Sequence, residues 1–141
     1  VGPGNGRYSV ESARAVAPGG SVVTIDIEPR MIERVQARAQ AESITNLEAR
    51  TADVYALPFA DGEFDAAYMI TVIGEIPQPG RALAEFQRVL NAGGTLAFSE
   101  LLMDPDYPTR RWLTRLARQA GFKLKSQSGN FFSYTLVFEK A

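Results

Sequence analysis

The chain contains no cysteine and no histidine among its 141 residues. The missing cysteine excludes disulfides, thiolate nucleophiles and thiolate-bound zinc or iron–sulfur centres. The missing histidine removes the commonest general base and the commonest metal ligand. Chemistry carried by this chain would rest on carboxylates, hydroxyls, backbone groups or a bound reagent, and a bound reagent fits this composition best.

The chain also lacks an excess of charge and any long apolar run. Its 15 basic and 16 acidic side chains leave a net charge of −1. This balance does not favour electrostatic binding of nucleic acid. No apolar run approaches the ~20 residues of a membrane span, and no signal-peptide pattern is present. We therefore expect a cytoplasmic protein that forms one domain over residues 1–141.

Strand-like and helix-like patterns alternate along the chain, which predicts an α/β fold with a doubly wound, mostly parallel sheet. The predicted strands cover residues 21–27, 46–51, 64–70, 95–101, 122–127 and 133–139. The predicted helices cover residues 8–17, a segment that starts at Pro29, a stripe over 82–90 that Gly93 and Gly94 end, and 109–120. The link over 128–132 is too short for a crossover helix, so the last two strands should pair antiparallel.

The last predicted helix follows Thr109, a residue type that caps helix N-termini. We expect this helix to turn Trp112, Leu113, Leu116 and Ala120 inward and to expose its arginines as a solvated face. The aromatic residues that we expect in the core are Trp112, Phe131, Phe132 and Tyr134.

A glycine-rich turn opens the chain as G-P-G-N-G, with glycines at Gly2, Gly4 and Gly6. Asp26 ends the next apolar run, 24 positions after Gly2, which is the length of one helix and one strand. That spacing places both features at the edge of a parallel sheet where nucleoside cofactors bind. Arg7 stands where a dinucleotide fingerprint has its third glycine, and no G-K-[ST] follows. The pattern suits a cofactor without a pyrophosphate; a glycine turn without any ligand also accounts for it.

Carboxylates follow two successive predicted strands. Asp26 closes an apolar strand, where a carboxylate is costly to bury unless it accepts hydrogen bonds, and a ribose diol offers two donors. The neighbouring Ile27 can lie flat on an adenine ring. Asp53 and Val54 can supply an acceptor for the adenine amino group and a backbone amide for a ring nitrogen, although Asp53 alone also fits a turn or cap.

Only Val1 precedes the glycine turn, whereas in a doubly wound fold that turn follows a strand in the middle of the sheet. A sheet without that strand would expose two unpaired edges. We therefore expect residues upstream of Val1 to belong to the working protein. Removal of an initiator methionine is the alternative.

In these features the chain resembles the class I S-adenosylmethionine-dependent methyltransferases, specifically those similar to the ubiquinone/menaquinone-biosynthesis methyltransferases. The resemblance is carried by G-P-G-N-G, V-V-T-I-D-I-E-P-R-M-I, L-P-F-A-D-G-E-F-D and R-V-L-N-A-G-G-T-L. It implies a Rossmann-like sheet in the order 3-2-1-4-5-7-6, with strand 7 antiparallel and strand 1 largely missing here. It also implies that S-adenosylmethionine is bound by Gly2, Gly4, Gly6, Asp26, Ile27, Asp53, Val54, Met69 and Ile70.

The sulfonium of this cofactor is an activated methyl donor, so transfer depends more on positioning than on side-chain chemistry. We expect metal-independent, in-line methyl transfer to a small-molecule acceptor that the sequence does not name, with no assigned catalytic residue or metal ligand. Glu75, Glu100 and Tyr107 could assist an acceptor that still carries its proton, but each reads more readily as a loop or turn residue. The alternatives are a nicotinamide-dependent reductase and a non-catalytic binding module. The sequence leaves the oligomeric state open.

Overall fold

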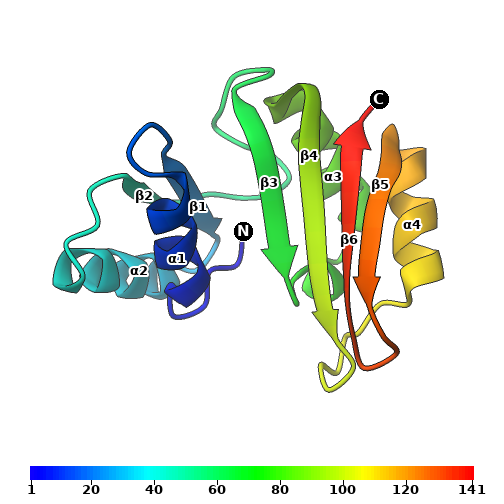
Figure 1. The fold of residues 1–141 in the computed structure, drawn as a ribbon, viewed down its shortest axis with the longest axis horizontal. Coiled ribbons are helices and arrows are strands. Elements are labelled where there is room, and N and C mark those ends of the chain that lie inside the picture. The colour runs from blue at the N-terminus through cyan, green and yellow to red at the C-terminus, as the bar shows by residue number, and fades with distance from the viewer. The chain divides into compact units, whose positions relative to one another are not determined.

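A computed structural model describes residues 1–141 as two compact units, Val1–Asp53 and Val54–Ala141 (Figure 1). The first unit holds a two-stranded sheet and the second holds a four-stranded sheet. None of the helices combines the length and the apolar character that crossing a bilayer requires.

The first unit is a helix–strand–helix–strand segment with a parallel sheet. Its elements are α1 (Arg7–Val16), β1 (Val22–Asp26), α2 (Pro29–Ala41) and β2 (Leu47–Thr51). Pro29 is the first residue of α2, as predicted, and the Glu28 side chain caps the helix by accepting from the Arg30 amide at 3.4 Å. Between the two strands Asp26 pairs with Thr51, so the carboxyl ends of β1 and β2 coincide.

The second unit contains the remaining elements of the chain. They are β3 (Phe64–Ile70), the short 3-10 helix η1 (Ile73–Glu75), α3 (Pro79–Val89), β4 (Leu90–Leu101), α4 (Arg110–Gln119), β5 (Phe122–Gly129) and β6 (Ser133–Lys140). The sheet order is β3-β4-β6-β5, with β3 parallel to β4. The last strand, β6, is antiparallel to both neighbours, which confirms the predicted hairpin.

The core of the second unit lies between this sheet and the helices α3 and α4, which lie on the same face of it (Figure 1). Alternate residues of β4 point into this core, and Phe98 meets Phe138 of β6 edge to face at 5.9 Å. Glu100 continues the same alternation and is as buried as the apolar residues before it. The strand therefore carries a carboxyl group into an apolar layer.

The boundary between α3 and β4 differs from the prediction. The helix ends at Val89 instead of running to Gly93, and Leu90 already pairs with Phe64 of β3. Leu90 is fully buried, so its place in the apolar stripe fits a strand as well as a helix. The glycines lie inside the strand segment, where the register with β3 shifts before Thr95.

Three aromatic residues that the sequence predicted to be buried are exposed. Trp112 is 41% exposed, and Phe131 and Phe132 are about 70% exposed. In α4 the buried positions are Leu113 and Ala117, four residues apart, which leaves Trp112 one position outside the stripe. The two phenylalanines lie in the β5–β6 connection and pack on each other. The predicted cap at Thr109 and the burial of Tyr134 are confirmed.

The arginines of α4 line an open groove with β5. Its lining residues include Arg110, Arg111, Arg115, Arg118 and Gln127. This is the solvated, basic face that the sequence predicted for the helix.

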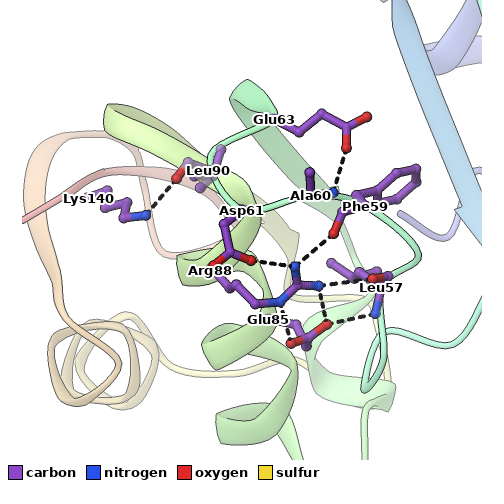
Figure 2. Close-up of polar contacts among 9 residues, drawn as sticks. All are labelled: Leu57, Phe59, Ala60, Asp61, Glu63, Glu85, Arg88, Leu90 and Lys140. Carbon is purple, nitrogen blue, oxygen red and sulfur yellow. Dashed lines mark hydrogen bonds and ion pairs between the residues drawn. The ribbon is translucent and has the colours of Figure 1, made fainter.

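Arg88 of α3 ties the loop before β3 to the helix (Figure 2). Its guanidinium donates to the carbonyl oxygens of Leu57 and Phe59 at 2.9 and 2.7 Å and pairs with Asp61 and Glu85. Glu85 in turn accepts from the Leu57 amide at 2.7 Å. The hydrogen bond from Arg88 lowers the pKa of the Glu85 carboxyl, which keeps this pair ionised.

We expect Arg88→Lys to lower the free energy of unfolding by about 1–3 kcal/mol, because an ammonium cannot satisfy two carbonyls and two carboxylates in this planar arrangement. Urea denaturation would measure the loss. Arg118→Lys, on the exposed side of α4, is the matched control and should leave stability unchanged. Equal stability of Arg88→Lys and the parent protein would contradict the anchoring role.

Candidate functional site

The opening glycine turn lies beside the end of β1 within the first unit. The Gly2 amide donates to the Ile25 carbonyl at 3.0 Å, and the Ala52 amide donates to the Asp26 carbonyl at 3.0 Å. The turn, the end of β1 and the end of β2 therefore share one edge of this unit, as the spacing of the sequence predicted.

Two glycines of the turn have different surroundings. Gly4 has a φ of +54°, and a Cβ added there would meet nothing within 4 Å, so its backbone borders open space. Gly6 has a φ of +79°, and a Cβ there would lie 3.2 Å from the Cα and Cγ2 atoms of Val35 in α2. Gly6 thus allows the start of α1 to pack closely on α2, while Gly4 leaves room for a ligand against the turn.

The side chains at the end of β1 suit a nucleoside. Asp26 is half-buried, and its Oδ1 accepts from the Glu28 amide at 2.9 Å, which leaves Oδ2 for a further donor. Ile27 is 71% exposed, so its side chain is accessible to a ligand. Asp53 follows β2 and is exposed. The residues present fit the polar and flat parts of an adenosyl group.

The other predicted cofactor-binding residues belong to the second unit. Val54, its first residue, is half-buried. At the end of β3, Met69 is fully buried and Ile70 is half-buried, so Ile70 has the more accessible side chain of the two.

The most unusual ionisable group of the second unit is Glu100. Its side chain is 1% exposed, and its Oε1 atom has no hydrogen-bond partner. Burial, together with the negative charges of Asp104 and Glu75, raises the pKa of the Glu100 carboxyl to about 7. A carboxyl whose pKa lies near 7 can accept or release a proton at physiological pH.

The segment after β4 is held against β6 beside this carboxyl. Tyr134 stands opposite Glu100 in the β4–β6 register, and its hydroxyl donates to the Pro108 carbonyl at 2.5 Å. Tyr107 packs edge to face on Tyr134 at 5.6 Å and donates to the Phe131 carbonyl at 3.1 Å. Burial raises the pKa of Tyr134, with the Glu100 charge as the next cause.

The sequence predicts a strand over residues 95–101 that includes Glu100, yet as a candidate for chemistry Glu100 is interpreted as a loop or turn residue. The structure places it inside β4 as a buried residue. A signal for this was present, because Leu96, Phe98 and Glu100 follow the two-residue period of a strand face. Burial of the first two residues implies burial of the third.

Comparisons with known proteins agree with this Rossmann-like arrangement. The family model described as "Methyltransferase domain" matches residues 1–98. The chain belongs to this family.

Several curated proteins are similar in sequence to part of the chain. The chain is 36% identical, over 86% of its length, to an uncharacterized 37.1 kDa protein in transposon TN4556 of Streptomyces fradiae, and this match spans 42% of that protein. It is 38% identical, over 68% of its length, to an uncharacterized protein of Mycobacterium tuberculosis, across 34% of that protein. An arsenite methyltransferase of Halobacterium salinarum is 28% identical over 77% of the chain and 28% of that protein. The chain thus spans less than half the length of these relatives.

Solved structures share the fold at low sequence identity. A SAM-dependent methyltransferase from Aquifex aeolicus has a TM-score of 0.92 at 18% identity, covering 99% of this chain and 79% of that one. The [4+2]-cyclase SpnF has a TM-score of 0.87 at 17% identity, covering 98% and 72%. Identities this low establish the fold alone. Together with the family match, the methyltransferase neighbours support S-adenosylmethionine as the cofactor.

We expect the raised pKa of Glu100 to make stability depend on pH. The folded state holds this proton more tightly than the unfolded chain does, so the free energy of unfolding should fall as the pH rises from about 4.5 to about 7. Glu100→Gln should remove this component, which amounts to up to about 3 kcal/mol at 1.36 kcal/mol per pKa unit. Urea denaturation at about pH 5 and about pH 8 would measure it.

Glu33→Gln, at an exposed position of α2, serves as the control and should keep the pH dependence of the parent protein. The assignment fails if the parent protein and Glu100→Gln lose the same stability between the two pH values.

Proposed function

We propose that this chain forms the cofactor-binding domain of an S-adenosylmethionine-dependent methyltransferase that acts on a small molecule. The observation that carries the proposal is the shared edge of the first unit, where the open glycine turn, Asp26 and Ile27 meet. The family match over residues 1–98 supports the same activity. Arg7, at the position of the third dinucleotide glycine, disfavours a nicotinamide reductase.

In this proposal each residue keeps the role that the resemblance implies for it. Asp26 accepts from the ribose hydroxyls, and Ile27 lies against the adenine. Asp53 and Val54 bind the edge of the adenine, the carboxylate accepting from the amino group and the amide donating to a ring nitrogen. The remaining contacts, to the methionine part of the cofactor, come from Gly2, Gly4, Gly6, Met69 and Ile70.

The chemistry proposed is an in-line substitution without a metal ion. When bound, the cofactor supplies a methyl group on a positively charged sulfur, which is already activated for transfer. The chain contributes position, because holding the acceptor atom at about 3 Å in line with the methyl group can supply several kcal/mol of the barrier. A cytoplasmic location and the sheet order 3-2-1-4-5-7-6 belong to the same proposal.

The assignment to the group that resembles ubiquinone/menaquinone-biosynthesis methyltransferases is also part of this proposal. It rests on two sequence pieces. L-P-F-A-D-G-E-F-D covers the loop before β3 and the start of that strand, and R-V-L-N-A-G-G covers the end of α3 and the start of β4.

Asp26→Asn tests the ribose contact. The amide oxygen can still accept from the Glu28 amide, so the turn is retained, but the group that faces the ribose loses its charge and one acceptor. We expect adenosylhomocysteine to bind ~1–3 kcal/mol more weakly, as measured by calorimetry. Unchanged affinity would refute the role assigned to Asp26.

Glu33→Gln is the matched control, since it also removes one carboxylate from the first unit but lies away from the strand ends in α2. NAD serves as a comparison ligand for both variants and the parent protein. Tighter binding of NAD than of adenosylhomocysteine would favour the alternative of a nicotinamide-dependent reductase. Binding of neither ligand would favour a non-catalytic binding module.

A further inference from the structure

The unpartnered oxygen of Glu100 requires a partner that the chain itself does not supply. A buried carboxylate without a hydrogen bond is strongly unfavourable, yet Oε1 of Glu100 has none. The charges that act on this carboxyl most are those of Asp104 and Glu75, and both are negative. No group of three His, Cys, Asp or Glu side chains in the chain is arranged to hold a metal ion. Oε1 of Glu100 is therefore open to a hydrogen-bond donor from a bound molecule.

Three acidic residues come from segments that meet at one edge of the second unit. Glu100 is the penultimate residue of β4, Asp104 follows in the turn after that strand, and Glu75 ends η1 after β3. Because β3 and β4 are parallel, their carboxyl ends lie at the same edge. In α/β sheets this is the edge at which ligands bind.

Close packing holds two of these segments together. Gly74 in η1 lies so near the backbone of Asp106 that an added Cβ would collide with its carbonyl oxygen. Asp104 Oδ1 accepts from the Asp106 amide at 2.9 Å, which fixes the turn after β4. The segments that carry Glu75 and Asp104 are thus packed against each other.

From this arrangement we infer that Glu100 receives the reacting group of the methyl acceptor, and that this group is an amine that arrives as an ammonium. This inference rests on the proposed methyltransferase function. Glu100 is 1% exposed, so the ammonium reaches this carboxyl only when the structure around it opens locally.

The charges around Glu100 decide between kinds of acceptor. A phenolate or carboxylate would meet three like charges, whereas an ammonium brings a positive charge and several N–H donors. Three further ionisable groups lie nearby. The hydroxyl of Tyr134 donates to the Pro108 carbonyl, and that of Tyr107 donates to the Phe131 carbonyl. Arg110 stacks on the Tyr134 ring at 5.1 Å. A buried, charge-assisted hydrogen bond to an ammonium is the strongest interaction that Oε1 can make.

The chemical step balances without another reagent. An ammonium proton passes to the Glu100 carboxylate, which leaves a neutral amine with a free electron pair and a neutral carboxyl group. That pair forms the new bond from nitrogen to the methyl carbon. The bond from that carbon to sulfur breaks, and its electrons stay on sulfur. The product is a methylated ammonium with adenosylhomocysteine, and the Glu100 proton returns to solvent.

The test compares three small probes of nearly equal size: 2-phenylethylammonium, 2-phenylethanol and phenylacetate. Their binding to the protein saturated with adenosylhomocysteine is measured by calorimetry at about pH 8, where Glu100 is mostly ionised. We expect the ammonium to bind at least about tenfold more tightly than the alcohol, the factor that corresponds to about 1.4 kcal/mol. Phenylacetate should bind more weakly than either.

Glu100→Gln should abolish the preference for the ammonium while the affinity for adenosylhomocysteine stays unchanged. Asp104→Asn, a turn variant that keeps an acceptor for the Asp106 amide, should reduce the preference and provides a second readout if Glu100→Gln does not fold. Glu33→Gln is the control and should behave as the parent protein.

Two results would overturn the inference: equal or absent binding of the ammonium and the alcohol, or a preference that survives in Glu100→Gln. Both leave the proposed function intact as long as adenosylhomocysteine binds. Failure of the parent protein to bind adenosylhomocysteine would instead remove the proposed function, and the inference with it.

Discussion

The second unit depends on the contacts that Arg88 makes at the end of α3. One guanidinium satisfies two backbone carbonyls of the loop before β3 and pairs with two carboxylates (Figure 2). A planar group with several fixed donors is needed for this, because loop carbonyls left buried without donors would each cost free energy. Through this contact α3 and the loop that leads into β3 keep one relative position.

This contact also explains the two sequence pieces that carry most of the resemblance to the ubiquinone/menaquinone group. Leu57 and Phe59 belong to L-P-F-A-D, and Arg88 begins R-V-L-N-A-G-G; the hydrogen bonds of Arg88 join one piece to the other. In this chain the two pieces therefore form one structural anchor of the second unit. Motifs of this kind identify a fold. The molecule that a protein of that fold acts on has to be argued from the residues of its site.

Local patterns in the sequence predicted most of the elements, and they failed where two elements share one pattern. Pro29 and Thr109 set helix starts by their own chemistry, so those boundaries were predictable. Leu90 fits an apolar helix stripe and a buried strand equally well, and only its pairing with Phe64 decides. The exposure of Phe131 and Phe132 likewise depends on the position of the β5–β6 connection, which no local rule fixes. In the first unit, the spacing was enough to predict that the glycine turn lies next to Asp26, because a helix followed by a strand returns the chain to the same edge of the sheet.

The burial of Glu100 could have been predicted from the two-residue period of the strand. It is overlooked when a charged residue is assumed to be exposed because of its type. The strand period places it on the same face as Leu96 and Phe98, and a leucine there would continue the apolar layer without a desolvation penalty. A carboxyl with an unsatisfied oxygen lowers stability at that position, and no group of the chain offsets the loss. Local structure that conflicts with the packing rules concentrates at functional sites. Ligands of this fold bind at the carboxyl ends of the parallel strands, and Glu100 lies at such an end. Its poor fit to the apolar core is therefore consistent with a role in binding or reaction.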